Sequence, residues 1–203
     1  MANDIKLFYD LTAQETADQW YGEEILKPTV LDFVSLLPAK PRVLDLGCGP
    51  GHESMRIAQT GAEVLGVDFS GECISIARAR CPQCRFEVMD FRDLDGRYGS
   101  FDGVFAAGSM PHLAPGEIGT VLKKIRSILT GNGYAAIIVV DGEGISEKFS
   151  NLEVDGRVLN RTFYLYTRKY ITEEAKKAGL KFVREGYLDP IFHKYGWRNY
   201  IFR

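Results

Sequence analysis

From residue 42 onward, short apolar runs alternate with longer segments in which apolar residues recur at helical spacing. Many of the short runs contain β-branched residues, and several are apolar on both faces, as strands buried in a parallel sheet are. The predicted strands are Arg42 to Leu46, Glu63 to Val67, Phe86 to Met89, Phe101 to Ala106 and Tyr134 to Val140.

The intervals between these runs are predicted to be helical. His52 to Thr60 stops before a glycine, and Ser70 is a suitable N-cap for a helix that runs to about Arg80. The most regular segment is Glu117 to Leu129, and Gly131 to Gly133 is expected to end it with a turn. Strands and helices in alternation predict an α/β protein with a doubly wound sheet.

The two flanks depart from this alternation. Pro28 is suited to open a helix before the first strand. Residues 141–170 contain no long periodic segment and are expected to cross the top of the sheet, and Thr172 is expected to cap a short helix after them. The closing strands, predicted to be antiparallel, are Lys181 to Tyr187 and Arg198 to Arg203. No linker is visible, so residues 1–203 are predicted to form a single domain.

Three glycines stand between the first predicted strand and the helix that follows it. They are Gly47, Gly49 and Gly51 in the segment VLDLGCGPG. Glycine lets a ligand approach the backbone closely, but the dinucleotide fingerprint needs a further glycine where this chain has His52. Pro50 has no N–H to give to a phosphate, and Glu53 places a negative charge in the first helical turn. The loop therefore favours a ligand without a phosphate.

Acids at the ends of the next two strands suggest what this ligand is. Asp68 follows Gly47 by twenty-one residues and ends the second strand, where a carboxylate can accept hydrogen bonds from both hydroxyls of a ribose. Asp90 ends the third strand and is suited to accept a bond from an adenine amino group, with Phe69 or Phe91 beside the ring. The pattern predicts an unphosphorylated nucleoside.

These segments resemble those of the class I S-adenosylmethionine-dependent methyltransferases. VLDLGCGPG, VLGVDFS and FEVMDF resemble the first three motifs of that family, FDGVFA with AGSMPHL resembles the fourth, and LTGNGY resembles the turn before the fifth strand. The match is ordered and covers about residues 40–140. It implies a seven-stranded, mostly parallel sheet of order 3-2-1-4-5-7-6, with the seventh strand antiparallel and helices on both faces. It also implies methyl transfer from S-adenosylmethionine, with S-adenosylhomocysteine as the product.

The resemblance also implies which residues bind the cofactor. Gly47, Gly49 and Gly51 would line its methionine part, while Asp68 would bind the ribose and Asp90 the adenine. Asp45 would support the loop, and Ala106 and Ala107 would lie beneath the sulfonium. The complete set is Asp45, Gly47, Cys48, Gly49, Gly51, Asp68, Phe69, Ser70, Asp90, Phe91, Ala106 and Ala107.

Methyl transfer requires a nucleophile held in line with the methyl group in a site without water, and a base only when the acceptor is protonated. His112 follows the fourth strand and is the candidate base, although it is as well suited to pin the loop before Pro115. Residues 1–37 are predicted to form a helical lid, and residues 141–170 to border the acceptor pocket. The candidate lid and substrate residues are Tyr9, Trp20, Tyr21 and His193. For the aromatic lid residues, ordinary helix packing is an equally good explanation.

Composition excludes several classes of partner. Lys and Arg number 25 and Asp and Glu 27, so the net charge of −2 provides no electrostatic footprint for nucleic acid. The longest apolar run, Tyr134 to Val140, is far shorter than the roughly 20 residues that cross a bilayer. The first residues, MANDIKLFYD, carry acids where a signal peptide is basic, so a cytoplasmic location is expected.

The four cysteines are too few for a disulfide scaffold and are expected to be thiols. Cys81 and Cys84 have the spacing of half a zinc site, but no second cysteine pair exists, so no metal site is predicted. Aromatic residues gather in the flanks, with 12 of 24 in residues 141–203. They favour a small-molecule acceptor with some apolar or cationic surface, bound by a monomer or a homodimer.

Three classes of function remain open at this point. The first is a small-molecule methyltransferase. The second is an S-adenosylmethionine-binding sensor or silent subunit without catalysis, which transfer of a labelled methyl group to a metabolite extract would distinguish from an enzyme. The third is a nicotinamide-dependent oxidoreductase, which His52 and Pro50 disfavour and a thermal-shift comparison of NADH with S-adenosylhomocysteine would test.

Overall fold

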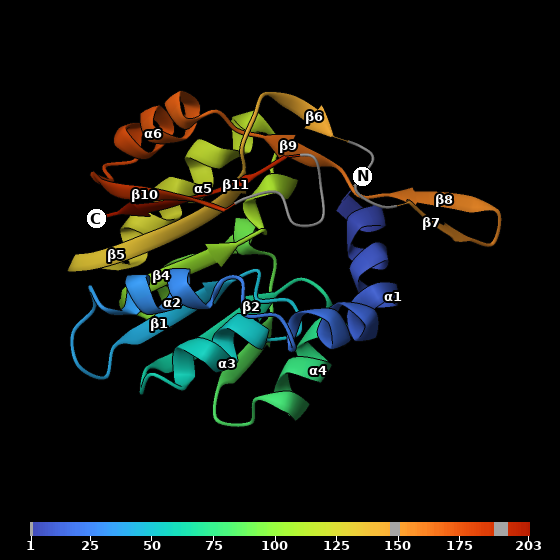
Figure 1. The fold of residues 1–203 in the computed structure, drawn as a ribbon, viewed down its shortest axis with the longest axis horizontal. Coiled ribbons are helices and arrows are strands. Elements are labelled where there is room, and N and C mark those ends of the chain that lie inside the picture. The colour runs from blue at the N-terminus through green and yellow to red at the C-terminus, as the bar shows by residue number, and fades with distance from the viewer. Residues whose placement is uncertain (1, 147–150, 189–194) are drawn as a thin grey trace.

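A seven-stranded sheet forms the centre of the molecule. The computed structural model describes residues 2–146, 151–188 and 195–203. The strands of this sheet are β1 Arg42–Leu46, β2 Glu63–Asp68, β3 Arg85–Val88, β4 Phe101–Ala107, β5 Leu129–Val140, β10 Phe182–Leu188 and β11 Trp197–Phe202. They lie side by side in the order β10-β11-β5-β4-β1-β2-β3 (Figure 1).

The pairing of the strands confirms the predicted topology. β1 lies between β2 and β4 and is parallel to both, and parallel pairs also join β2 to β3 and β4 to β5. β11 is antiparallel to both β5 and β10. Since β10 and β11 are the last two strands of the chain, the order is 3-2-1-4-5-7-6 with an antiparallel seventh strand, as predicted.

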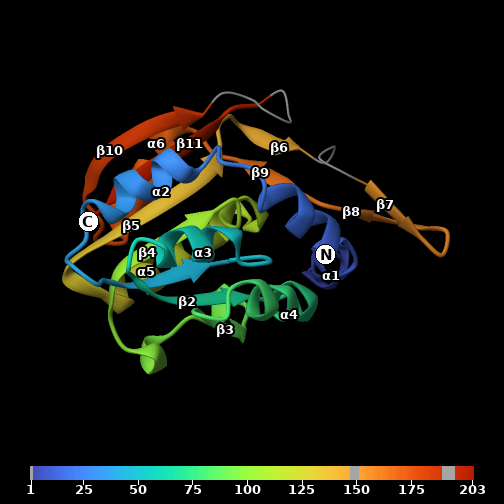
Figure 2. The same cartoon turned by 60° about the horizontal axis from the view of Figure 1, so that its bottom comes forward.

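Helices cover both faces of the sheet. Their bounds are α1 Ala2–Trp20, α2 Lys27–Val34, α3 His52–Ala58, α4 Gly71–Arg80, α5 Pro115–Ile128 and α6 Arg168–Lys177. One core contains Phe33 of α2, Ile57 of α3 and Ile74 of α4, so these helices share a face, on which α2 and α3 lie side by side (Figure 2). The other core contains Ile125 of α5 and Ile171 of α6. Burial of apolar surface on both sides stabilises the parallel strands between them.

Two local predictions are wrong. β5 begins at Leu129, directly after α5, so Gly131 to Gly133 lie inside a strand and not in a turn. α6 begins directly after Thr167, whose hydroxyl accepts a hydrogen bond from the backbone N–H of Tyr170 at 3.2 Å, and Thr172 lies within the helix. Thr167 and Thr172 are both suitable N-caps for this helix, and in the structure Thr167 is the one that caps it.

The segment between β5 and α6 contains four short strands that the sequence pattern did not predict. They are β6 Gly144–Ser146, β7 Asn151–Val154, β8 Arg157–Asn160 and β9 Phe163–Leu165. β6 pairs with β9, and β7 pairs with β8, both antiparallel. Asp155 and Gly156 join β7 to β8 with positive φ angles of 50° and 73°, as a two-residue hairpin turn requires. The hairpin projects from the body of the protein (Figure 1).

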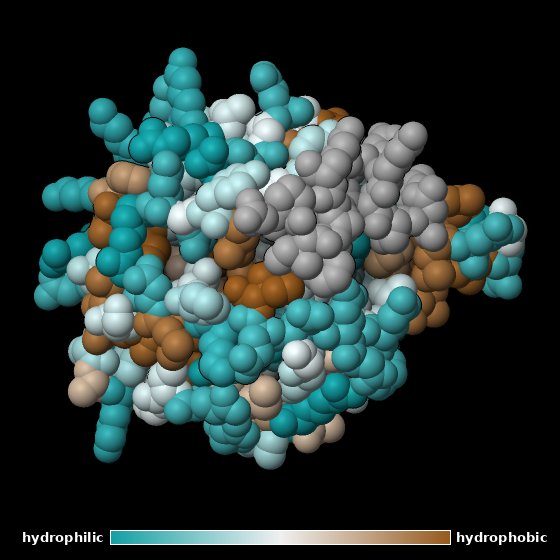
Figure 3. Space-filling view, viewed as in Figure 1, coloured by the Kyte–Doolittle hydropathy of each residue, from teal (hydrophilic) through white to brown (hydrophobic). Residues whose placement is uncertain are grey.

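The surface is mostly polar on the face seen in Figure 3, and hydrophobic residues gather on the projecting β7–β8 hairpin. Val158 in this hairpin exposes 51% of its surface. Within the described ranges, no helix combines the length and the apolar character that crossing a bilayer requires.

α1 lies at the carboxyl ends of the parallel strands (Figure 2). The hydroxyl of Ser70, which caps α4, donates a hydrogen bond to Asp10 Oδ1 at 2.6 Å. At the end of the helix, the hydroxyl of Tyr21 donates to the carbonyl of Pro50 at 2.9 Å. These bonds hold α1 over the edge of the sheet where ligands bind in open α/β folds.

A buried arginine of α3, Arg56, connects this helix to the end of α1. Arg56 Nη1 lies 2.8 Å from Glu53 Oε1, and the two side chains expose only 9% and 5% of their surface. The guanidinium also donates to the backbone carbonyls of Trp20 and Glu23. Arg56 therefore donates hydrogen bonds both to the backbone at the end of α1 and to the carboxylate of Glu53.

Arg56→Met is expected to destabilise the protein by about 3–5 kcal/mol near pH 8, because Glu53 must then either keep a buried charge without a partner or take up a proton from solution. Burial raises the pKa of Glu53 to about 7, so this acid is neutral at pH 5. The decrease in the free energy of unfolding is therefore expected to be smaller at pH 5 than at pH 8. Urea unfolding at both pH values measures the difference. Arg97→Met, which removes an exposed pair with Asp95, is the control and is expected to cost less than about 1 kcal/mol. Equal effects of the two substitutions would contradict this account.

Candidate functional site

A cavity of about 910 Å³ opens at the carboxyl ends of β1, β2 and β4. Its walls come from α1, the loop after β1, the segments that follow β2, β3 and β4, and residues between β7 and β9. The crevice between β1 and β4 is the place where the strand order reverses and where α/β sheets bind ligands. Pockets for one small ligand measure about 300–1,000 Å³, so this cavity has room for a nucleoside and a small second molecule.

The three glycines after β1 lack a side chain for two different structural reasons. A Cβ atom on Gly47 would lie 2.3 Å from Ser109 Cβ, and one on Gly51 would lie 2.8 Å from Ala77 Cβ. These two residues allow the loop to pack closely against its neighbours. A Cβ atom on Gly49 would meet nothing within 4 Å, its φ is +52°, and the residue lines the cavity. Gly49 is therefore the place where a ligand can approach the backbone.

Asp68, the last residue of β2, faces the cavity. Its two carboxylate oxygens accept hydrogen bonds from the backbone N–H groups of Gly49 and Ser70, each at 2.9 Å. Each oxygen has one partner and can accept another. Burial raises the pKa of Asp68 to about 6. A buried carboxylate with unused acceptor capacity fits the two hydroxyls of a ribose.

Further buried acids lie beneath the glycine loop. Asp45 in β1 accepts a hydrogen bond from the hydroxyl of Ser54 at 2.6 Å, and burial raises its pKa to about 7. Next to it, Glu53 Oε2 and His52 Nδ1 are buried without a hydrogen-bond partner in the part of the chain described. Both residues line the cavity, and the sequence analysis did not include them in the site. Unpaired polar atoms at this end suit the polar tail of a ligand.

Asp90 and Phe91 line the cavity on the side of β3. Asp90 caps a short 3-10 helix, Phe91–Asp93, by accepting the N–H of Arg92 at 2.9 Å. Partial burial favours the neutral acid, but hydrogen bonds from Arg92 hold the pKa of Asp90 below its usual range. The carboxylate thus reaches the cavity while it is bound to an arginine.

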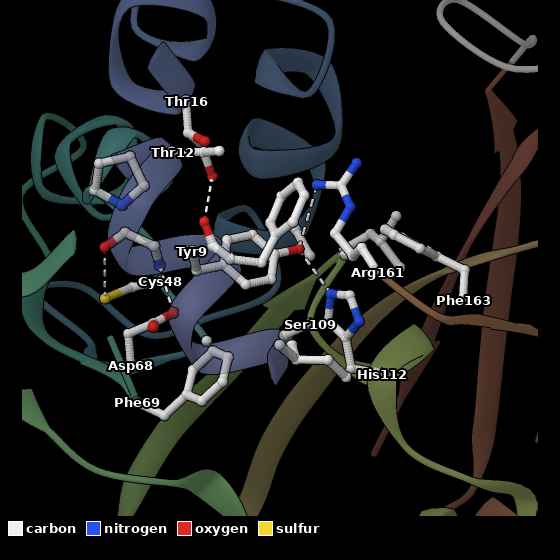
Figure 4. Close-up of a pocket in the computed structure, with 18 of the residues that line it drawn as sticks. Tyr9, Thr12, Thr16, Cys48, Asp68, Phe69, Ser109, His112, Arg161 and Phe163 are labelled. Atoms are coloured by element: carbon white, nitrogen blue, oxygen red, sulfur yellow. Dashed lines mark hydrogen bonds between the residues drawn. The ribbon is translucent and has the colours of Figure 1, made fainter. Parts of the chain in front are cut away.

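His112 forms a chain of hydrogen bonds with Tyr9 and Thr162, and Figure 4 shows the bond to Tyr9. Its Nδ1 lies 3.0 Å from the carbonyl oxygen of Thr162, and its Nε2 lies 2.7 Å from the hydroxyl of Tyr9. A carbonyl only accepts, so Nδ1 carries the proton and Nε2 accepts the Tyr9 O–H. Burial lowers the pKa of His112 to about 4, and burial raises the pKa of Tyr9 above its usual value. Both groups are therefore neutral near pH 7.

Arg161 approaches the same tyrosine from the segment between β8 and β9, with Nη1 3.4 Å from the Tyr9 oxygen (Figure 4). Phe163 lies next to His112, with ring centroids 4.7 Å apart, and Trp197 of β11 borders the same space. The sequence analysis did not identify these three residues. The only sequence signal was the gathering of aromatic residues in the C-terminal flank, and it did not single out any one of them.

The predicted site residues divide into three groups. The cavity is lined by Tyr9, Trp20, Asp45, Gly47, Cys48, Gly49, Asp68, Phe69, Asp90, Phe91, Ala107 and His112. Four others do not line it, namely Tyr21, Gly51, Ser70 and Ala106. Ser70 and Tyr21 support neighbouring elements through the bonds described above, and Ala106 is buried in the core. His193 lies outside the described residues.

Cys81 and Cys84 lie close together after α4. Their sulfur atoms are 3.1 Å apart, and both residues are buried at the end of α4. Within residues 2–146, 151–188 and 195–203, no group of three or more His, Cys, Asp or Glu side chains is arranged to hold a metal ion.

Comparison with known proteins agrees with the motifs and the geometry. Residues 43–133 match the family model described as a methyltransferase domain. The matched part of the chain is a methyltransferase domain. It contains the glycine loop, Asp68, Asp90 and His112, so the resemblance inferred from the motifs is confirmed over the segment that carries them.

Curated relatives of this methyltransferase domain are also methyltransferases. An uncharacterised methyltransferase of Synechocystis is 28% identical over 117 residues, which are 58% of this chain and 55% of the relative. The ubiquinone biosynthesis O-methyltransferase of Xanthomonas axonopodis is 37% identical over 111 residues, 48% of this chain and 46% of the relative. The chain thus spans about half the length of the curated relatives that it matches.

A solved structure shares the whole fold. It is the 1,6-didemethyltoxoflavin-N1-methyltransferase of Burkholderia thailandensis, with 1,6-didemethyltoxoflavin and S-adenosylhomocysteine bound. The TM-score is 0.78 at 22% identity, and the alignment covers 100% of this chain and 88% of the other. The fold of the methyltransferase domain and of both flanks therefore has a known counterpart.

Proposed function

We propose that this protein transfers a methyl group from S-adenosylmethionine to a nitrogen or oxygen atom of a small molecule. The observation that carries the proposal is that Asp68 and Gly49 line the same cavity as the hydrogen-bonded pair of Tyr9 and His112. The names of the relatives support it, since one acts in ubiquinone biosynthesis and the solved neighbour holds 1,6-didemethyltoxoflavin.

The part of the cavity at the carboxyl ends of β1, β2 and β3 suits the cofactor. S-Adenosylmethionine supplies a methyl group activated by a positively charged sulfur. Asp68 would accept the ribose hydroxyls, and Gly49 leaves space for contact with the loop. Phe69 and Phe91 would border the adenine, and Glu53 offers an unpaired oxygen to the ammonium group of the methionine part.

The opposite side suits an acceptor that loses a proton. An N–H or O–H of the acceptor would give its proton to the Tyr9 oxygen while the Tyr9 O–H proton moves to His112 Nε2. The imidazolium formed keeps Nδ1 bound to the carbonyl of Thr162. A neutral pair is a weak base, but it suffices because an acceptor atom becomes more acidic as it gains a methyl group. His112 would thus act through Tyr9 and not by direct contact with the acceptor.

Aromatic rings form much of the wall around the Tyr9–His112 pair. The Tyr9 ring contacts the rings of Phe8 and Phe69, with centroid distances of 5.8 Å and 5.9 Å. Phe163 borders His112 on the other side and lies 6.4 Å from the ring of Trp197. Exclusion of water by such rings favours displacement, because water would compete as a nucleophile and screen the charges that react.

The affinity for S-adenosylhomocysteine is expected to fall by about tenfold between pH 7 and pH 5. Asp68 must be ionised to accept both ribose hydroxyls, and its raised pKa of about 6 means that it gains a proton in this interval. Calorimetric titrations at pH 5, 6 and 7 measure the change. Asp68→Asn is the control and is expected to bind weakly with a smaller pH dependence, which remains because Glu53, whose pKa is about 7, also gains a proton in this interval. If the variant shows the same tenfold decline, another group is responsible.

Transfer of a radiolabelled methyl group tests the proposed function. The protein is incubated with labelled S-adenosylmethionine and a cell extract, and the products are separated by mass. We expect protein-dependent label in the small-molecule fraction and none with Asp68→Ala. Label in protein or nucleic acid would contradict the proposed acceptor class, and cofactor binding without transfer to any fraction would favour a sensor or silent subunit.

A further inference from the structure

Arg161 presents a guanidinium group at the cavity with little to bind it. Its Nη1 is 3.4 Å from the Tyr9 hydroxyl, and its Nε is buried with no hydrogen-bond partner in the part of the chain described. Within the same part, no carboxylate oxygen lies within 4.0 Å of its guanidinium nitrogens. A buried charged donor without a partner is unfavourable, so the position needs an explanation from function.

The other arginine that lines the cavity is different. Arg92 lies 2.7 Å from an oxygen of Asp90 and 3.5 Å from one of Glu117, so both its charge and its planar donors are used within the protein. Arg157, the first residue of β8 and four residues before Arg161, pairs with Asp4. Both of these arginines are therefore neutralised by acids, whereas Arg161 has no such partner in the part of the chain described.

Aromatic rings surround the Arg161 guanidinium. Its central carbon lies 5.2 Å from the ring centroid of Phe8, 5.7 Å from that of Tyr9 and 4.9 Å from that of Phe163. Rings within about 6 Å of a guanidinium stabilise the cation and displace water from it. They do not form hydrogen bonds at its edge, and an arginine has five N–H donors in a fixed plane. The rings thus hold the charge in place while donors remain for a ligand.

We propose that Arg161 binds a carboxylate of the methyl acceptor, so that the substrate is a small, flat, apolar molecule that carries a carboxylate. The inference rests on the function proposed above. A guanidinium pairs with a carboxylate through two parallel hydrogen bonds, which fixes orientation as well as position. Because Arg161 also contacts the Tyr9 hydroxyl, an acceptor bound in this way has its body beside the Tyr9–His112 pair. The rings of Phe163 and Trp197 then face the apolar part of the molecule.

Benzoate and benzamide are suitable probes, because they share a flat ring and differ in the charge of one group. The protein is first saturated with S-adenosylhomocysteine, and each probe is then titrated by calorimetry. We expect benzoate to bind at least about tenfold more tightly than benzamide, as a charge-assisted pair requires. Arg161→Gln is expected to abolish this preference and to keep its affinity for S-adenosylhomocysteine, while Arg161→Lys keeps a reduced preference because it lacks the planar fork.

Arg157→Gln is the matched control, since it removes the same charge four residues away without removing a residue that lines the cavity. It is expected to keep the preference for benzoate. Equal affinity of the wild-type protein for the two probes, or no saturable benzoate binding, overturns the proposal even if a variant fails to fold. An unchanged preference in Arg161→Gln overturns it as well. If the wild-type protein does not bind S-adenosylhomocysteine in the first step, the proposed function fails instead.

Discussion

Asp68→Ala is expected to weaken the binding of S-adenosylhomocysteine by about 100-fold or more, because two hydrogen bonds to a charged acceptor are lost together. The substitution also frees the N–H groups of Gly49 and Ser70, which Asp68 holds at 2.9 Å. Calorimetry measures the affinity, and circular dichroism shows whether the fold is kept. We expect a folded protein, because burial already disfavours the charge of Asp68.

Asp95→Ala is the matched control for this experiment. Asp95 is an exposed acid that caps a short 3-10 helix and pairs with Arg97 outside the cavity. Its removal is expected to leave the affinity for S-adenosylhomocysteine unchanged. If Asp68→Ala binds as tightly as this control, the ribose does not lie at the end of β2 and the cofactor half of the site is wrong.

Tyr9→Phe is expected to lower the rate of methyl transfer by about 100-fold, the lower range of what a positioned acid or base contributes. The ring remains, but the hydroxyl that connects the acceptor to His112 is lost. The affinity for S-adenosylhomocysteine is expected to change little, because the hydroxyl points toward His112 and Arg161 (Figure 4). Rates are measured with the acceptor that the labelling experiment identifies.

His112→Ala is expected to cause a similar loss, and the double variant with Tyr9→Phe to lose no more than either alone, because the two groups act as one unit. Tyr170→Phe is the control, since that hydroxyl bonds to the carbonyl of Pro115 and the residue does not line the cavity. Additive losses would show that Tyr9 and His112 act separately. Full activity of both single variants would leave His112 with a purely structural role.

Much of the fold follows from the sequence because its signals are local. β1 was predicted with both ends correct, since a short apolar run is followed at once by the glycine loop. Ser70 was predicted to cap α4, and its hydroxyl does accept the N–H of Cys73 at 3.1 Å. The position of Asp68 at the end of β2 likewise follows from the length of one apolar run. Where the structure depends on a single strand, turn or helix cap, the local sequence pattern is sufficient to predict it.

The acceptor side could not be predicted in the same way because it depends on contacts between distant residues. Tyr9 and His112 are separated by 103 positions, and Tyr9 and Arg161 by 152. Neither contact belongs to a motif, and Arg161 lies between two strands of four and three residues that are too short to show a period. The sequence identified His112 and Tyr9 as separate candidates, and only the fold brings them together.

A crystal structure of the protein with S-adenosylhomocysteine tests the central claim most directly, namely that one cavity holds the cofactor beside β1 and β2 and leaves the side of Tyr9, His112 and Arg161 for the acceptor. We predict both ribose hydroxyls within hydrogen-bond distance of the Asp68 carboxylate and the cofactor sulfur facing the side of the cavity that contains Tyr9. A ribose bound away from Asp68, or a cofactor that fills the space beside Arg161, would contradict the account.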